Sequence, residues 1–244
     1  MKRVGFFVVI LIATLVATLP ATLMDLVVAS ATNGLVRLAS AEGNFWHGSG
    51  IVTTIGRNRS SQAWRPVSWR FHWVGTGAPA VAVHESDKPI ARLEFTLRGP
   101  RLSTFDADLP VGMLVHAIPH PVARAGWHGF IHLASTGLTC TWHQVCDGEL
   151  RAVWHAAGSD IAPNHRFGSY LLALQLTGGN AAMELTTLSG DLLLSGHGSV
   201  NRAGETSFSG TVSGDPALID RLPDIMDRNA RSTGKAGIVS LTFP

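Results

Sequence analysis

Two pairs of histidines have a spacing that could support metal chemistry in this chain. His116 and His120 lie four residues apart in HAIPHP, and His128 and His132 lie four apart in WHGFIH. Residues at this spacing share one face of a helix or a strand, so two imidazoles can converge on one zinc ion. Prolines around the first pair disfavour a helix, and neither segment has an HExxH pattern or a nearby acidic residue to complete a ligand set. We therefore expect surface histidines and no metal site.

Serines in glycine-rich surroundings and paired carboxylates are the other candidates for chemistry. Ser49, Ser195 and Ser213 do not fit the GxSxG pattern of a nucleophile elbow. Asp106 and Asp108 have the i, i+2 spacing that is common on the solvated face of a strand. Neither a dinucleotide-binding nor a phosphate-binding glycine motif is present. The sequence therefore predicts a protein that is not an enzyme and has no cofactor.

The only two cysteines, Cys140 and Cys146, lie in CTWHQVC. A CxxC spacing would suit thiol exchange better, and two thiols without further cysteines make a poor zinc site. In an oxidising compartment a disulfide that closes this short loop would stabilise the fold by about 2 kcal/mol. We interpret the pair as a structural disulfide.

The composition is typical of a β-rich extracytoplasmic domain. Charged residues make up 15% of the 244 residues, which include 26 glycines and 7 tryptophans, whereas charged residues are about 25% of an average globular protein. The net charge is +2, and without Lys2 and Arg3 the basic residues fall from 19 to 17, equal to the 17 acidic residues. This balance argues against a nucleic-acid-binding surface.

The N-terminal segment has the character of a membrane anchor. Residues 4–24 contain no charged side chain, and about 20 apolar residues suffice for a helix to cross a bilayer. Lys2 and Arg3 flank this stretch on one side and Asp25 on the other. The positive-inside rule then places the N-terminus in the cytoplasm and the body in the periplasm.

A cleaved signal peptide is the alternative, because Ala29-Ser30-Ala31 has the small residues of a cleavage site. The apolar stretch is longer than the usual core of a signal peptide, about 7–15 residues, and this length favours an uncleaved anchor. We therefore expect a cytoplasmic start at 1–3, a transmembrane helix at 4–24 and a single β-rich periplasmic domain at 25–244.

Helical periodicity is confined to two further places. Leucines and a valine after residue 22 are spaced to line one side of a helix, with Pro20 as a break or kink and Gly34 as its end; Val36 to Leu38 are expected to be extended. Near the C-terminus, Asp215 and Pro216 can start a short amphipathic helix whose apolar stripe runs to Met226.

Elsewhere the dominant period is two, as in WRFHW at 69–73, LRAVWHA at 150–156 and LLALQLT at 171–177. Apolar residues alternate with polar ones, and turn signals rich in glycine and asparagine separate the segments. The fold class predicted is mainly β: a curved, largely antiparallel sheet that follows the N-terminal helix.

Trp46 stands among glycines in AEGNFWHGSG at 41–50. In a strand over 45–55, Trp46, Gly48 and Gly50 point to one face, so the indole can lie on a lane without side chains and shield the backbone. Packing is the interpretation that we favour; contact with the membrane interface or with a partner is the alternative.

Taken in order, these features resemble the type II secretion system protein N family. That family has a membrane helix with Leu-Pro near its end, and a first hairpin with a Gly-x-Leu/Phe-Trp-x-Gly pattern. Further elements are similar to Val67-Ser68-Trp69, Gly168-Ser169-Tyr170, Leu192 to Gly196 and Phe208-Ser209-Gly210. The residues that match the pattern, as structural positions or partner contacts, are Gly43, Phe45, Trp46, Gly48, Trp69, Gly168 and Tyr170. The histidine-rich middle, from 116 to 155, departs from the pattern.

The resemblance implies a non-catalytic inner-membrane subunit of the machinery that exports folded proteins across the outer membrane. Its expected partners are other subunits of that machinery, either the inner-membrane platform or the secretin. A periplasmic protein that binds a lipid or another apolar ligand is the alternative, motivated by the apolar strand faces and the low charge.

Overall fold

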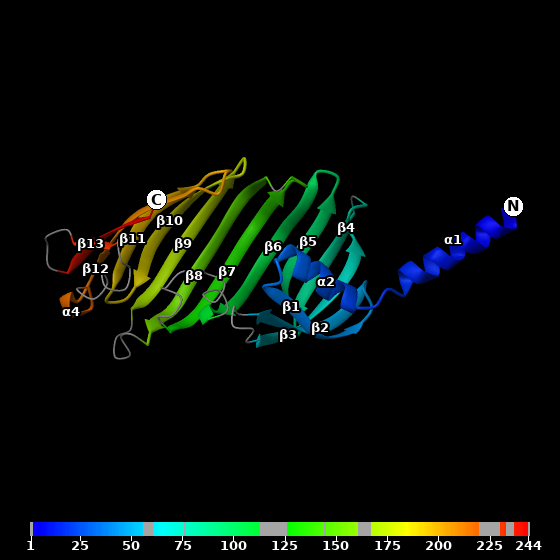
Figure 1. Ribbon diagram of the computed structural model, residues 1–244, viewed down its shortest axis with the longest axis horizontal. Coiled ribbons are helices and arrows are strands. Elements are labelled where there is room, and N and C mark those ends of the chain that lie inside the picture. The colour runs from blue at the N-terminus through cyan, green and yellow to red at the C-terminus, as the bar shows by residue number, and fades with distance from the viewer. Residues whose placement is uncertain are drawn as a thin grey trace. The chain divides into compact units, whose positions relative to one another are not determined.

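In a computed structural model, the chain forms two N-terminal helices followed by a series of strands (Figure 1). The structure describes residues 2–55, 61–75, 77–112, 126–143, 145–160, 167–219, 230–232 and 237–243. Two compact units are present, Met1–Arg92 and Leu93–Pro244. Every strand pair with a determined register is antiparallel. The mainly β, antiparallel fold class is therefore confirmed.

Unit 1 contains both N-terminal helices and the first strands, which lie side by side in chain order from β1 to β5. Its elements are α1 (Lys2–Ala17), α2 (Thr22–Ala31), β1 (Val36–Gly43), β2 (His47–Ile55), β3 (Ser61–Trp73), β4 (Pro79–Glu85) and β5 (Lys88–Thr96), the last of which continues into unit 2.

The single transmembrane helix predicted at 4–24 is wrong in its bounds, because two helices share this stretch. α1 ends at Ala17 and α2 begins at Thr22. Pro20 lies between them, has no N–H for the helical hydrogen-bond ladder, and forms an isolated antiparallel bridge with Asn44. Within the described part of the chain, the helices lack the combination of length and apolarity required to cross a bilayer.

The second helix follows the sequence pattern more closely. α2 buries Met24 and lies against β1. It ends at Ala31, and Gly34 then adopts a positive φ of 78° and donates its N–H to the carbonyl oxygen of Ala29 at 2.7 Å. β1 begins at Val36, as predicted. A glycine that ends a helix and releases the chain into a strand is a frequent C-terminal signal.

Unit 2 is a longer antiparallel meander. Its strands are β6 (Gly99–Pro110), β7 (Trp127–Cys140), β8 (Cys146–Ser159), β9 (Gly168–Thr177), β10 (Asn180–Ser189), β11 (Leu193–Val200), β12 (Thr206–Ser213), β13 (Ala230–Ser232) and β14 (Ile238–Phe243). They are neighbours in chain order up to β12, after which β14 lies between β12 and β13. Of the C-terminal helix predicted from Asp215 to Met226, α4 (Pro216–Ile219) is described, and residues 220–226 lie outside the described residues.

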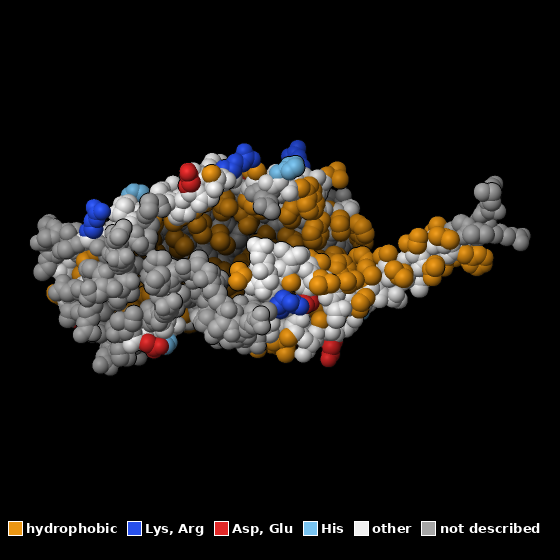
Figure 2. Space-filling view, in the orientation of Figure 1, with side chains coloured by type: hydrophobic (Ala, Val, Ile, Leu, Met, Phe, Trp, Pro, Cys, Tyr) orange, Lys and Arg blue, Asp and Glu red, His pale blue; other side chains and the backbone are white. Residues whose placement is uncertain are grey.

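The two faces of the unit 2 sheet differ in polarity, as the alternation of apolar and polar residues predicts. We define the apolar face by cross-strand rows of the register; one row is Leu133, Ala152, Leu172, Leu185, Gly196, Gly210 and Leu241, and the next is Ser135, Leu150, Leu174, Met183, Gly198, Phe208 and Phe243. The charged side chains of Arg151 and Glu184 and most of the hydroxyl side chains of these strands occupy the alternate positions, together with a few small or apolar residues such as Ala173. Figure 2 shows hydrophobic side chains gathered over a hollowed part of the strands of this unit.

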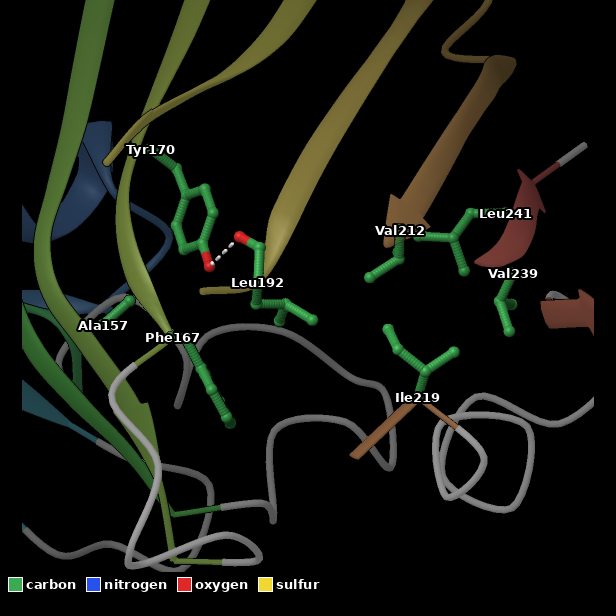
Figure 3. Packing of buried hydrophobic residues seen from close by; sticks show 8 residues of the cluster. All are labelled: Ala157, Phe167, Tyr170, Leu192, Val212, Ile219, Val239 and Leu241. Atoms are coloured by element: carbon green, nitrogen blue, oxygen red, sulfur yellow. Dashed lines mark hydrogen bonds between the residues drawn. The ribbon is translucent and has the colours of Figure 1, made fainter. Parts of the chain in front are cut away.

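One end of the apolar face is closed into a core (Figure 3). Ile219 on α4 is 1% exposed and points toward the side chains of Val212, Val239 and Leu241. Tyr170 and Leu192 complete the cluster from β9 and from the turn before β11, together with Ala157 and Phe167.

Candidate functional site

The turn between β1 and β2 contains the glycine, phenylalanine and tryptophan of the predicted motif. Gly43 has a φ of 91°, and a Cβ there would lie 2.7 Å from the carbonyl oxygen of His47, so this position requires glycine. The side chain of Asn44 holds the turn, because its Oδ1 accepts the backbone N–H groups of Trp46 and His47, both at 2.9 Å. The turn thus presents Phe45 and Trp46 at a fixed place.

Pro20 and Trp46 are coupled through one carbonyl group. In an uninterrupted helix, the N–H of residue 20 would donate to the carbonyl oxygen of Val16, but proline has no N–H. The indole N–H of Trp46 donates to that oxygen instead, at 2.8 Å. The indole N–H of Trp46 therefore supplies the hydrogen bond that Pro20 cannot donate to the carbonyl oxygen at the end of α1. This bond connects the proline break to the Trp46 turn, two features that local sequence patterns do not relate.

Phe45 makes a second link between the helical segment and the sheet. Its backbone N–H donates to the carbonyl oxygen of Leu19 at 2.8 Å. Its carbonyl oxygen accepts the indole N–H of Trp69 on β3 at 3.0 Å. A short turn therefore connects the end of α1 to the third strand through backbone groups, and this arrangement does not depend on ionic strength.

The prediction that Trp46 lies over Gly48 and Gly50 is wrong, and Trp69 occupies that lane. β2 begins at His47, so Trp46 belongs to the turn and does not share the strand alternation. Trp69 is the cross-strand partner of Gly48. A Cβ on Gly48 would lie 2.6 Å from Cζ2 of Trp69 and one on Gly50 would lie 3.7 Å from its Cζ3, and Trp69 is only 4% exposed.

Phe45, Trp46 and Phe71 form what we call the aromatic cluster. Ring centroids are 5.3 Å apart for Phe45 and Trp46, 5.2 Å for Phe45 and Phe71, and 5.3 Å for Trp46 and Phe71. Two of the contacts are edge-to-face, the arrangement that the ring quadrupoles favour. The backbone N–H of Phe71 also donates to the carbonyl oxygen of Trp46 at 2.7 Å. The cluster is a packed junction with no group suited to catalysis.

An ion pair that sequence reasoning missed joins α2 to β1. The Arg37 guanidinium donates from Nε to Oδ1 of Asp25 at 2.9 Å and from Nη2 to Oδ2 at 2.5 Å, and the Leu38 N–H donates to Oδ1 at 2.8 Å. The hydrogen bonds from Arg37 lower the pKa of Asp25; partial burial opposes them, and the Leu38 N–H and the charge of Arg37 act in the same lowering direction. No periodic signal connects residues 12 apart across a helix end and a turn.

Gly168 and Tyr170 lie in unit 2, at the closed end of the apolar face. Gly168 has a φ of 138°, and a Cβ there would lie 2.0 Å from the carbonyl oxygen of Ser189. The Tyr170 hydroxyl donates to the carbonyl oxygen of Leu192 at 2.9 Å inside the core (Figure 3). Burial raises the pKa of this hydroxyl, and the charge of Asp191 adds to the effect. Both residues have a structural role in the fold.

Phe208 and Gly210, from the last element of the resemblance, repeat the packing seen at Trp69. A Cβ on Gly196 would lie 2.5 Å from Cζ of Phe208, and one on Gly210 would lie 3.1 Å from its Cε1. The ring therefore lies on glycines of its own and the neighbouring strand. The short motifs of aromatic residues and glycine in this sequence thus reflect close packing of rings on backbone.

His128 and His132 do not converge on a common ligand site. His128 lies 2.7 Å from a carboxylate oxygen of Asp160, and His132 lies 2.9 Å from one of Asp108, so each imidazole contacts its own aspartate. Aspartates that are distant in the sequence therefore lie beside both histidines, one carboxylate to each imidazole. Among the described residues no group of three or more His, Cys, Asp and Glu could hold a metal ion. His116 and His120 lie outside the described residues.

The predicted disulfide joins Cys140 to Cys146, at the ends of β7 and β8. The two residues are direct cross-strand partners. The turn that they enclose contacts the neighbouring β5–β6 turn, since the indole N–H of Trp142 donates to the carbonyl oxygen of Leu97 at 3.2 Å. The bond closes a hairpin end, which supports the structural interpretation.

A row of Glu184, His197 and Ser209 crosses the polar face of unit 2 in adjacent register positions. They line a hollow of about 900 Å³ and have the residue types of a hydrolytic triad. A triad also needs an oxyanion hole, and the paired register on both sides of β11 uses the strand backbone for the sheet. These three side chains form no hydrogen bonds with one another.

Comparison with known proteins gives one assignment. Neither a curated protein sequence nor a solved structure is significantly similar to the chain. The model of type II secretion system protein N matches residues 34–238, which is most of the chain and includes the turn at 43–48, Trp69, Gly168 and Tyr170. With a match of this extent, the chain belongs to the type II secretion system protein N family.

Proposed function

We propose that this protein is a non-enzymatic, inner-membrane-anchored periplasmic subunit that supports the export of folded proteins by the type II secretion machinery. The observation that carries the proposal is the family match over residues 34–238. The structure offers an antiparallel sheet in which the family-like motifs pack aromatic rings on backbone. A role in assembling the secretion machinery, through contacts with its other subunits, fits this architecture.

Membrane attachment through residues 4–24 is part of the proposal. This stretch has no charged side chain, and Phe6, Phe7 and Leu11 on α1 are 65%, 70% and 66% exposed. Figure 2 shows the hydrophobic side chains along α1. Apolar surface of this kind is unfavourable in water and favourable in lipid. Lys2 and Arg3 favour a cytoplasmic N-terminus, and the disulfide supports an oxidising compartment for the body.

Fractionation tests the attachment. We expect the full chain to remain in the membrane pellet after alkaline extraction, and its mature N-terminus to precede residue 4. A mature chain that begins near Thr32 and is released into the soluble periplasm would contradict the anchor and support a cleaved signal peptide.

Contacts with the platform or the secretin test the role in secretion. We expect a tagged full chain to co-purify with other subunits of the machinery from native envelopes, and its deletion to reduce export of a folded substrate. A photoreactive residue at exposed His47, next to the aromatic cluster, is expected to crosslink to one subunit. The same residue at exposed Gly75 is the matched control. Export unchanged by deletion, with no associated subunit, would overturn the proposal.

Binding of an apolar ligand is the second candidate function, because the apolar face of unit 2 motivates it. Its two rows cross seven strands and contain no charged side chain. Native mass spectrometry of the gently extracted chain distinguishes the candidates. Stoichiometric lipid favours ligand binding, and a ligand-free chain favours a role in assembly alone.

A further inference from the structure

The polar face of unit 1 contains a hollow that we call the basic hollow. It has a volume of about 560 Å³ and is lined by β2, β3 and β4. Arg70 occupies its centre, since the register places His47 on one side of it and Ala82 on the other. His72 lies two residues after Arg70 on β3, and His84 lies two residues after Ala82 on β4, opposite Ser68. An arginine and three histidines therefore line one hollow.

Small side chains leave the floor of this basic hollow open. Ser49 and Ser68 are direct cross-strand partners, and Ala82 lies opposite Arg70. The serine hydroxyls add hydrogen-bond donors next to the basic groups. The volume falls within the range of about 300–1,000 Å³ that is usual for small-ligand sites.

Arg70 has no ionic partner in the described part of the chain. In the same unit, Arg37 binds Asp25 and Arg65 binds Glu85. Asp87 lies at the edge of the basic hollow, and Glu42 faces the same side opposite Ser49, but neither carboxylate is paired with Arg70. An exposed guanidinium with free donors is suited to a planar bidentate contact with a phosphate group.

The basic hollow and the junction with α1 lie at the same level along β3 but on opposite faces of the sheet, because side chains alternate along the strand and Phe71 points away from the face of Arg70 and His72. Phe71, between Arg70 and His72, contacts Trp46, whose indole N–H reaches the carbonyl oxygen of Val16 in the last turn of α1. Trp73, one residue after His72, is 76% exposed. Tryptophans beside basic residues are characteristic of the headgroup level of a membrane.

We propose that the basic hollow binds the phosphate group of a phospholipid headgroup, and the proposal rests on the membrane attachment of residues 4–24 given above. The guanidinium of Arg70 binds two phosphate oxygens, and the histidines and serines donate to the phosphate from the sides. The aromatic cluster lies in the interfacial layer. The bound headgroup fixes the orientation of the first strands against the bilayer.

Titration of the full chain in a neutral detergent tests this site. The probes are a short-chain, water-soluble phosphatidylglycerol and inorganic phosphate, with binding measured by isothermal titration calorimetry. We expect saturable binding of the lipid, weakened about tenfold or more in Arg70→Gln, and weakened in a His47→Gln, His84→Gln double variant. Arg98→Gln removes the same charge from an exposed position in unit 2 and is expected to bind as the wild type.

Each result of the titration decides a separate point. Equal affinity for inorganic phosphate and the lipid would overturn the lipid as the source of the phosphate. Absence of binding, or binding unchanged in a folded Arg70→Gln chain, would overturn the site. The measurement requires neither a membrane nor a secretion subunit, so failed extraction or co-purification experiments would contradict the proposed function without altering this readout.

Discussion

Unit 1 and unit 2 both pack an aromatic ring on strand glycines, but they use the polar groups of aromatic residues differently. In unit 1, Trp69 covers Gly48 and its indole N–H binds Phe45 in the turn that leads to the helices. In unit 2, Phe208 covers Gly196, and the hydroxyl of Tyr170 binds within the core. Rings on glycines are thus a shared packing device. The hydrogen bonds of the aromatic side chains join helix to sheet in unit 1 and reinforce the sheet core in unit 2.

The largest effect is expected at the core of unit 2. Tyr170→Ala removes a buried aromatic ring and should lower the free energy of unfolding by about 3–5 kcal/mol. Tyr170→Phe keeps the ring and loses only the hydrogen bond to Leu192, for about 1 kcal/mol. Urea unfolding of both variants measures the difference. Equal losses would show that the hydroxyl, and not the ring, supports this end of the sheet.

Gly48→Ala tests the packing of rings on glycines in unit 1. The new Cβ would lie 2.5 Å from the carbonyl oxygen of Glu42 and 2.6 Å from Trp69, so we expect a loss of about 1–3 kcal/mol. Gly75→Ala, with nothing within 4 Å, is the control and should stay within about 0.5 kcal/mol. Gly196→Ala, against Phe208, should resemble Gly48→Ala. A neutral Gly48→Ala would remove the parallel between the units.

Trp46→Phe tests the link between helix and sheet. The ring contacts remain, but the carbonyl oxygen of Val16 loses the shorter of its two hydrogen bonds and keeps the one from the Leu19 N–H at 3.5 Å, so we expect a cost of about 1 kcal/mol at most. In a Pro20→Ala background, the N–H of residue 20 can bind that oxygen, so the cost of Trp46→Phe should shrink. A double-mutant cycle on the free energy of unfolding measures the coupling. Additive effects would mean that Pro20 and Trp46 act independently.

The smallest effect is expected at the ion pair of Asp25. Asp25→Asn should lower the free energy of unfolding by about 1 kcal/mol at most, because solvent screens the pair. The pKa of Asp25 is lowered in the folded state, so its contribution is complete above the unfolded pKa of about 3.9 and is lost as the pH falls through the folded value. The difference between wild type and variant should therefore be present at pH 6 and vanish at strongly acidic pH. A difference that persists in acid would assign the effect to packing.

Local patterns predicted the strands well. The alternation of a strand, and the residues that end a helix or strand, can both be recognised within a few neighbouring positions. Gly34 followed by a strand at Val36, the alternation of Leu172 and Leu174, and the short loop between the cysteines are all signals of this kind. The mainly β class and the structural disulfide were accessible from the sequence for this reason.

Features that depend on where a strand begins, or on distant segments, were not accessible in the same way. A start of β2 at His47 moves Trp46 out of the alternation and leaves Trp69 to cover the glycines. Pro20 signalled a break, but only the fold reveals that a side chain 26 positions later occupies the vacated carbonyl. The basic hollow required the register of three strands, which brings Arg70 and the histidines together.

The order of strands in unit 2 has a consequence for biogenesis. From β6 to β12 each strand lies beside the one made just before it, so pairing can proceed progressively during synthesis of the chain. Such nearest-neighbour growth keeps loop closure inexpensive and limits the time for which an unpaired edge is available for aggregation. Only the final step differs, because β14 must enter between β12 and β13. Pairing at this edge of the sheet therefore cannot be completed before β14 has been synthesised.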